Sequence, residues 1–450
     1  MTLSSNGMLI RTGILAVIVI VVVAFFWFVV GPGPLDFAGG KTVAIAAYSG
    51  ANPTGVPVEF AKDDLVTRGR YLTQAADCQA CHTTEGGLPF AGGRAFKTPF
   101  GTLYSPNITP DRETGIGTWT DADLLQAIHQ GISRDGTRLY PAFPYAAYTY
   151  LADADVLAIK AYLFSLPAVH NAPPANSLAF PYNQRWLMAI WSFLYNPDQR
   201  FQPNAERSPE WNRGAYLAEA LGHCGDCHTP RNRLQALDNH RKFAGTVVQG
   251  WRAYNITGDQ DTGVGAWNNA ELTSYLSTGH ATGRGTASGP MAEAVDLSLA
   301  HLSATDHAAI VAYLRSVPAI PSPDLPAPKA EPAPAAPKLG TPAGIDSRGQ
   351  KLFAGACAGC HDWTGVSPLS PLATLTGGRA VNDPSAANVA QIILLGALRQ
   401  TIQGVSIMPA FGSAYSDVEI AALANYVVAR FGAKPSAITA EEIAELRRMQ

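Results

Sequence analysis

RGRYLTQAADCQACHTTEGG, at residues 68–87, contains the pattern that determines the fold. The same arrangement returns as RGAYLAEALGHCGDCHTPRN at residues 213–232 and as RGQKLFAGACAGCHDWTG at residues 348–365. Each stretch has Arg-Gly, an apolar segment with helical spacing, and then Cys-x-x-Cys-His. Such internal repetition indicates one structural unit built three times along the chain.

A second signature follows each motif, namely a helical stretch that contains a tyrosine and begins near Ser, Thr or Asp. Each repeat is therefore expected to run from a first helix through the cysteine motif and intervening helices to a closing helix, which predicts an all-α fold. The three stretches lie at residues 151–166, 302–317 and 415–431, with Tyr162, Tyr313 and Tyr426.

The N-terminus carries an apolar run, GILAVIVIVVVAFFWFVV at residues 13–30. Its length at the helical rise is roughly 27 Å, close to the hydrocarbon core of a bilayer. Arg11 precedes it, which favours a cytoplasmic N-terminus. A cleaved signal peptide is the alternative, but the run is long for one and VVGPGP lacks an Ala-x-Ala cleavage pattern. An uncleaved anchor is favoured, and either interpretation sends the remainder across the inner membrane.

Composition marks the joints between the repeats. The tract VPAIPSPDLPAPKAEPAPAAPKLGTPAG is expected to be extended and semi-rigid rather than packed. The net charge of −3, with 15% charged residues and no long basic run, argues against nucleic acid as a partner. The predicted boundaries are an anchor at 1–35, domains at 60–170, 208–318 and 345–432, a connector at 171–207, a linker at 319–344 and a tail at 433–450.

Two further segments lie outside the repeats. WLMAIWSFLY at residues 186–195 is expected to pack across the joint between the first two domains, with a surface against membrane or a partner subunit as the alternative. Residues 440–448 predict a short amphipathic helix whose contacts the sequence does not indicate.

Cys-x-x-Cys-His is the spacing of c-type haem attachment. Two thiols one helical turn apart can form thioethers with the two vinyl groups of one haem, and the adjacent histidine reaches the iron. Three covalently bound haems would use every cysteine of the chain. The predicted covalent ligands are Cys78, Cys81, Cys224, Cys227, Cys357 and Cys360, and the predicted iron ligands are His82, His228 and His361.

Zinc and dithiol redox chemistry are the alternatives for any single motif. Zinc would need further cysteines or histidines at ligand spacing, and none pair up. A thioredoxin-like site would need a βαβ pattern, which this sequence lacks. Three copies within repeated helical domains favour haem.

The sixth iron ligand of a cytochrome c is usually a methionine. In the third repeat it is predicted to be Met408, since this is the only methionine between Cys360 and the closing helix. In the second repeat, Met291 lies 24 residues after the tryptophan that ends NITGDQDTGVGAW.

The first repeat departs from this pattern. NITPDRETGIGTW matches the second-repeat segment without a gap, and 24 residues after its tryptophan lies Phe143. No methionine stands between His82 and the end of this repeat. His129 is a candidate replacement, although its helical angle is equally that of a solvated surface histidine. His170 is a weaker candidate, and a five-coordinate iron covered by Phe143 is the third possibility.

The chain resembles the three-haem cytochrome c subunits of bacterial membrane-bound dehydrogenases. The resemblance rests on RGRYL…DCQACHT, YSPNITPD…GIGTW, LYPAFPY and RGAYL…GHCGDCHTPRN, and it covers about residue 60 to the C-terminus. It implies three tandem cytochrome c-type domains behind an N-terminal transmembrane helix. It further implies haem domains in the periplasm and electron transfer from a dehydrogenase to ubiquinone.

That family serves several catalytic subunits: quinoprotein alcohol dehydrogenases, flavin-dependent gluconate or fructose dehydrogenases, and molybdopterin aldehyde dehydrogenases. Phe143, the retained anchor and SPEWNRGAYL at residues 208–217 are more similar to the aldehyde dehydrogenase branch. There the resemblance implies a molybdopterin catalytic subunit and a small [2Fe–2S] subunit as partners.

No site for oxidising an organic substrate is evident in the sequence, so no catalytic residue is predicted. Met291 and Met408 predict conventional one-electron carriers in the second and third repeats. Two other functions are rivals. A haem peroxidase could use an open first iron, and an electron-delivery subunit of a terminal oxidase would also be anchored.

Overall fold

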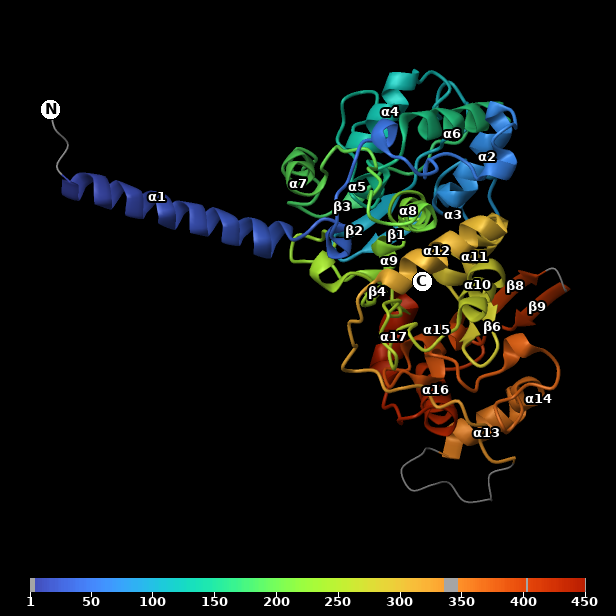
Figure 1. Cartoon of the computed structure of the whole chain (residues 1–450). Helices are drawn as coiled ribbons and strands as arrows, with labels where there is room; N and C mark the ends of the chain where they lie inside the picture. Colours follow the sequence, from blue (N-terminus) through green and yellow to red (C-terminus); the bar gives the residue numbers. More distant parts are fainter. Residues whose placement is uncertain (1–4, 336–346, 402–403, 450) are drawn as a thin grey trace.

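The computed structural model describes residues 5–335, 347–401 and 404–449. Helix α1 (Ser5–Phe25), extended by a π-helical turn η1 (Phe26–Val30), projects away from the rest of the chain (Figure 1). The remainder forms three successive groups of elements that correspond to the first repeat (residues 60–170), the second repeat (208–318) and the third repeat (345–432). In Figure 1 these groups follow one another from top to bottom.

In the first repeat, the predicted closing helix at residues 151–166 is confirmed as α6. It packs against the repeat's first helix, α2. The elements of this region are η2 (Asp36–Ala38), η3 (Ile45–Ala47), η4 (Val58–Phe60), α2 (Leu65–Ala75), α3 (Cys78–His82), β1 (Ala95–Thr98), β2 (Gly101–Tyr104), α4 (Asp121–Gln130), α5 (Tyr145–Tyr148) and α6 (Asp153–Ser165).

The connector contributes β3 (Ser177–Leu178), which completes an antiparallel sheet with β2 and β1, and α7 (Leu187–Tyr195). The second repeat follows and closes with α12, as predicted. Its elements are α8 (Pro209–Ala215), η5 (Tyr216–Leu221), α9 (Gly225–His228), η6 (Asn239–Arg241), β4 (Thr246–Val248), β5 (Trp251–Ala253), α10 (Asn269–Thr278), β6 (His280–Ala281), β7 (Gly285–Thr286), α11 (Pro290–Leu297), η7 (Leu299–His301) and α12 (Ala304–Ser316).

The third repeat has the same order of helices and also closes with the predicted helix, but its hairpin follows the middle helix, α15. Its elements are α13 (Ser347–Ala356), α14 (Ala358–His361), η8 (Pro371–Ala373), η9 (Ala380–Asn382), α15 (Ala387–Leu395), β8 (Ala397–Thr401), β9 (Gly404–Met408) and α16 (Asp417–Phe431), followed by α17 (Ala440–Met449). The fold is mainly helical, but the all-α prediction is wrong in detail, because small antiparallel sheets occur in all three regions.

The Arg-Gly pair of each repeat is explained by the crossing of its first and closing helices. A Cβ atom on Gly69 would lie 1.9 Å from the Ala158 carbonyl oxygen. A Cβ atom on Gly214 would lie 1.9 Å from the Ala309 carbonyl oxygen, and a Cβ atom on Gly349 would lie 2.2 Å from that of Ala422. The recurring tyrosines of the closing helices, Tyr162, Tyr313 and Tyr426, supply the next contact at each crossing. Only glycine permits two helical backbones to approach this closely.

The first and second repeats share one hydrophobic core and exchange equivalent hydrogen bonds. The Tyr71 hydroxyl donates to Asp306 Oδ2 over 2.6 Å, and the Tyr216 hydroxyl donates to Asp155 Oδ2 over 2.5 Å. Each tyrosine belongs to the first helical segment of one repeat and each aspartate to the closing helix of the other. The contact is therefore two-fold in character, like the isologous interface of a homodimer.

The third repeat has a core of its own, which includes Phe353, Tyr426 and Ile443. Ile443 belongs to α17, so the predicted C-terminal amphipathic helix is confirmed and packs on this core. The expectation that the Pro/Ala tract does not pack is wrong for its described part. There Ala333 is buried and donates its backbone N–H to the Thr364 carbonyl. Residues 336–346 lie outside the described residues.

Candidate haem-binding site

One continuous cavity of about 1870 Å³ reaches all three cysteine motifs. Its wall is mostly apolar, as a site for a large planar hydrophobic group requires. All the predicted cysteine, histidine and methionine ligands line it, apart from the two candidate replacements in the first repeat. The lining residues include Cys78, Cys81, His82, Phe143, Cys224, Cys227, His228, Met291, Cys357, Cys360, His361 and Met408.

Each cysteine motif forms or borders a single helical turn, α3, α9 or α14. Residues three apart lie on one face of a helix, so the two thiols of a motif point to the same side. All six cysteines are free of disulfides. Burial raises the pKa of Cys78 and Cys224 to about 12, so these thiols are neutral, unlike the thiolates of dithiol redox sites.

The histidine of each motif is held by the same backbone contact. Its Nδ1 lies within hydrogen-bond distance of a carbonyl oxygen, 2.8 Å for His82 and Pro106. The distances are 2.7 Å for His228 and Tyr254 and 2.6 Å for His361 and Ala373. A carbonyl fixes Nδ1 as the protonated nitrogen, which leaves Nε2 available to a metal. Burial also lowers the pKa of all three imidazoles, so they are neutral, as an iron ligand must be.

The positions of the expected sixth ligands are set by one recurring turn. The helix before each ligand ends at a glycine with a positive φ: 64° at Gly131, 71° at Gly279 and 71° at Gly396. A short hairpin or isolated bridge follows each glycine, and Phe143, Met291 and Met408 all stand twelve residues after it. Phe143 therefore occupies the register of both methionines. Its ring lies 5.6 Å from that of Tyr148.

His129 lies elsewhere. Its side chain is only 3% exposed, so the expectation of a solvated surface histidine is wrong. It does not line the cavity. Its Nδ1 lies 3.7 Å from Asp153 Oδ1, and its buried Nε2 finds no hydrogen-bond partner among the residues that the structure describes. Burial, helped by the charge of Arg200, lowers the pKa of His129 to about 4. The structure does not bring this ring to the first motif.

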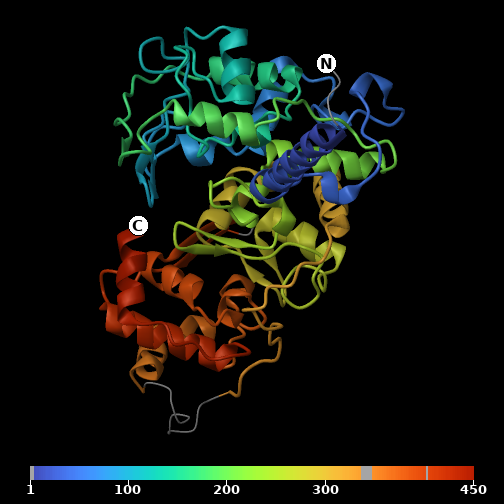
Figure 2. The same cartoon turned by 90° about the vertical axis from the view of Figure 1, so that its left-hand side faces the viewer.

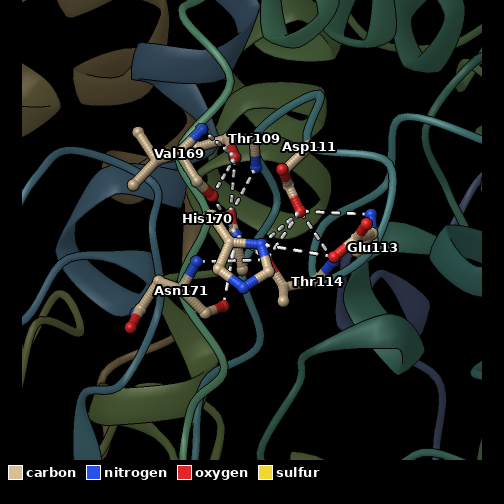
Figure 3. A network of polar contacts seen from close by, with 8 residues as sticks. Thr109, Asp111, Glu113, Thr114, Val169, His170 and Asn171 are labelled. Carbon is tan, nitrogen blue, oxygen red and sulfur yellow. Dashed lines mark hydrogen bonds and ion pairs between the residues drawn. The ribbon is translucent and has the colours of Figure 1, made fainter.

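His170 is also absent from the cavity wall. Its ring is largely exposed and lies 3.6 Å from Asp111 Oδ1 and 3.8 Å from Glu113 Oε2 (Figure 3). Asp111 in turn accepts from the backbone N–H and hydroxyl of Thr114. The network holds the loop after β2, which lines the cavity, against the segment beyond α6.

Comparison with known proteins agrees with this geometry. Residues 66–167 match the family model described as cytochrome c, and residues 345–427 match that of cytochrome C oxidase, cbb3-type, subunit III. The gluconate 2-dehydrogenase cytochrome c subunit of Pantoea cypripedii is 38% identical over 86% of this chain and 90% of its own length. The fructose dehydrogenase cytochrome subunit of Gluconobacter japonicus is 36% identical over 92% of this chain and 89% of its own length.

The chain belongs to the family of dehydrogenase cytochrome c subunits. Another relative, a nicotinate dehydrogenase subunit of Pseudomonas putida, is 42% identical over 83% of this chain, which spans only 31% of that relative's length. Membership implies covalently bound haem c, and the cysteines, neutral histidines and apolar cavity fit that group.

Zinc, the alternative for a single cysteine motif, would need further ligands beside each cysteine pair. Among the described residues, no three His, Cys, Asp or Glu side chains come together to hold a metal ion.

Sequence reasoning missed two features of this cytochrome's cavity. Helix α7 supplies part of the wall through Met188, Trp191 and Leu194. The sequence predicts joint packing for this segment, or a surface against membrane or a partner subunit, but no contribution to the cavity. Arg94 donates to the Ala80 carbonyl of the first motif and, through both terminal nitrogens, to Glu293 on α11. Since α11 carries Met291, Arg94 links the first motif to the second repeat's ligand helix. The isolated arginine gave no sequence signal for this long-range contact.

Proposed function

We propose that this chain is a membrane-anchored, tri-haem electron-transfer subunit that carries electrons from a periplasmic dehydrogenase to ubiquinone. The observation that supports it best is the single cavity reached by all three cysteine motifs. A haem supplies a one-electron Fe(III)/Fe(II) couple whose potential depends on its axial ligands and burial. The motifs would hold the haems within three tandem cytochrome c domains with the boundaries given above.

The protein's own residues account for the difference between the sites. His228 with Met291, and His361 with Met408, would provide paired axial ligands in the second and third domains. In the first domain the cavity offers His82 on one side and Phe143 in the register of the sixth ligand. Since His129 lies outside the cavity, we favour an open first site covered by Phe143.

The favoured donor is a molybdopterin aldehyde dehydrogenase with a small [2Fe–2S] subunit. Phe143, the anchor and residues 208–217 support this branch through resemblance. Similarity to a nicotinate dehydrogenase subunit adds nicotinate as a candidate substrate of the partner. The alternatives are a quinoprotein alcohol dehydrogenase and a flavin-dependent gluconate or fructose dehydrogenase. A haem peroxidase or an oxidase-associated cytochrome is less well supported.

The proposed location is the inner membrane, with α1 as a single span and the haem domains in the periplasm. Residues Gly13–Val30 have a mean hydropathy of 3.2, and none of those described is buried, as expected of a helix surrounded by lipid. A signal sequence would satisfy the same criterion, and sequencing the N-terminus of the mature protein distinguishes the two.

The test is reduction of the haem α-band in the solubilised native complex after separate additions of acetaldehyde, nicotinate, ethanol, gluconate and fructose. Rapid reduction by acetaldehyde alone supports the favoured branch. Reduction by one of the others moves the chain to the corresponding dehydrogenase. If none reduces the haems, the dehydrogenase assignment fails; peroxide turnover by the isolated chain, or co-purification with a multi-span oxidase, would then identify a rival.

A further inference from the structure

Helix α7 presents an apolar face to the outside of the molecule. Trp186, Ile190 and Phe193 are 63%, 54% and 83% exposed. They are spaced four and three residues apart, so they lie along one side of the helix. The helix contains no acidic or basic residue. Phe180 and Tyr182, in the loop before it, are exposed as well. An exposed apolar patch of this kind marks a contact with lipid or another protein.

The opposite face of α7 is buried against the protein. The Trp191 ring packs edge-on against Tyr145 at 5.8 Å, and its Nε1 donates to the Leu234 carbonyl in the second repeat. The Ser192 hydroxyl donates to the Tyr145 hydroxyl over 3.2 Å. Packing across the joint, as expected from sequence, is thus confirmed for this inner face. It leaves the outer face without a partner in the described chain.

The C-terminal end of α7 is hydrogen-bonded to η1, the turn that extends α1. The Tyr195 hydroxyl at the end of α7 donates to the Val29 carbonyl over 2.8 Å, and Asn232 Nδ2 donates to the same oxygen over 3.1 Å. The Trp27 ring lies 5.0 Å from that of His240. Figures 1 and 2 both show α7 on the side of the molecule from which α1 projects.

We infer that the outer face of α7 lies in the lipid interface of the membrane that α1 crosses. This inference rests on the proposed role of α1 as a membrane anchor. The hydrogen bonds to Val29 fix α7 at the level where the span ends, and aromatic side chains such as Trp186 and Phe193 favour that level of a bilayer. A partner protein would have to compete with lipid for a face already placed at the membrane surface.

The inference also places the haem cavity relative to the membrane. The inner face of α7 contributes Met188 and Leu194 to the cavity wall. Lipid on the outer face would therefore be separated from the cavity by one helix, about 10 Å in diameter. A membrane-dissolved quinone could approach the cavity from this side, beside the first repeat.

Photo-crosslinking of the full chain within its native complex tests this placement. Para-benzoylphenylalanine would replace Phe193, Leu369 or Ile20, one at a time, in vesicles of phosphatidylethanolamine and phosphatidylglycerol. Leu369 is the matched control, since it is 71% exposed but lies in the third repeat. Ile20, 67% exposed in α1, reports on the anchor itself. An unchanged α-band would establish that each variant retains its haems.

Phospholipid adducts at positions 20 and 193, with at least tenfold fewer at 369, are the expected result. Adducts at 20 without adducts at 193 would overturn the placement of α7 and leave the anchor intact. Crosslinks from 193 to another subunit would also overturn it. A lack of lipid adducts at position 20 would contradict both the anchor assignment of α1 and the placement of α7. Electron transfer from the dehydrogenase is tested separately, by the reduction assay.

Discussion

Phe143 is the side chain that would distinguish the first haem site from the other two in the proposed tri-haem subunit. It stands in the register of Met291 and Met408 after a left-handed glycine, and it contacts Tyr145 and Tyr148 rather than offering a donor atom. An aromatic ring there could exclude water from a haem iron held by His82, but it carries no atom that would bind the metal. The first haem should therefore differ from the others in spin state and potential.

Replacing this residue tests the assignment. Phe143→Met is expected to supply a thioether sulfur and to convert the first haem to a low-spin form. Electronic and EPR spectra of the oxidised protein should then lose a high-spin signal that accounts for about one haem in three. The reciprocal variant Met291→Phe should double that signal. Three low-spin haems in the unaltered protein would contradict the open site.

His129 makes the stability of the chain depend on pH. Its folded-state pKa of about 4 lies below the ordinary value of 6.5. Between these values the unfolded chain binds the proton more readily, so stability is complete above pH 6.5 and decreases as pH falls towards 4. The contribution of this titration to the free energy of unfolding is on the order of 2 kcal/mol. The unfolding midpoint in guanidinium chloride should decrease less between pH 7 and pH 5 in His129→Gln, and an identical decrease would refute this role.

Single residues were predictable where chemistry fixes their spacing. The cysteines, adjacent histidines and two methionines all line the cavity. The proposed haem attachment and axial ligation would require them at set positions, which is why their spacing could be recognised. The environment of His129 could not be predicted in this way. Its helix angle places it at the edge of an apolar stripe, and long-range neighbours such as Asp153 and Arg200 decide whether that edge is covered.

At the scale of elements, the crossing of first and closing helices depends on a glycine. Gly349→Ala would place a Cβ atom 2.2 Å from the Ala422 carbonyl oxygen, so α13 and α16 would have to separate. We expect a loss of about 2–3 kcal/mol in the free energy of unfolding of the third repeat.

Gly355→Ala, in the same helix, is the matched control. Apart from the helix's own neighbouring backbone, no described atom lies within 4 Å of the position its Cβ would take. This variant should gain roughly 0.5 kcal/mol from better helix propensity. Calorimetry of the full chain measures both, and equal melting temperatures for the two variants would contradict the close crossing.

The sequence predicted an element best when the element was long enough to show a periodic spacing of apolar residues. The closing helices have several turns of apolar spacing, and they match α6, α12 and α16 closely. The hairpins were missed because strands of two to five residues are too short to show alternation. The packing of the Pro/Ala tract on the third repeat was missed because it depends on long-range hydrogen bonds, such as those of Ala333 with Thr364 and Lys329 with Asn382, which composition does not encode.

For the whole molecule, the cores predict two cooperative units. One core spans the first and second repeats, and a separate core serves the third. Differential scanning calorimetry should therefore resolve two transitions rather than one or three. Tyr216→Phe removes a hydrogen bond from the buried Asp155. It should lower the free energy of unfolding of the paired repeats by about 1–3 kcal/mol and leave the transition of the third repeat unchanged.

Lys351 occupies the corresponding position of the third repeat and is exposed. Lys351→Gln should therefore leave both transitions unchanged. A single transition, or an equal shift of both transitions in Tyr216→Phe, would contradict the division into two units.

The exchanged tyrosine–aspartate bonds have a consequence for how such chains can be shortened or recombined. Deleting the first repeat would strip Asp306 of the Tyr71 hydroxyl and expose the apolar surface the two repeats share. Deleting the second would do the same to Asp155. These two repeats should therefore be inherited and exchanged as a single block. The third repeat has its own core, but Arg399 links it to the second through the carbonyls of Thr278 and Ala287.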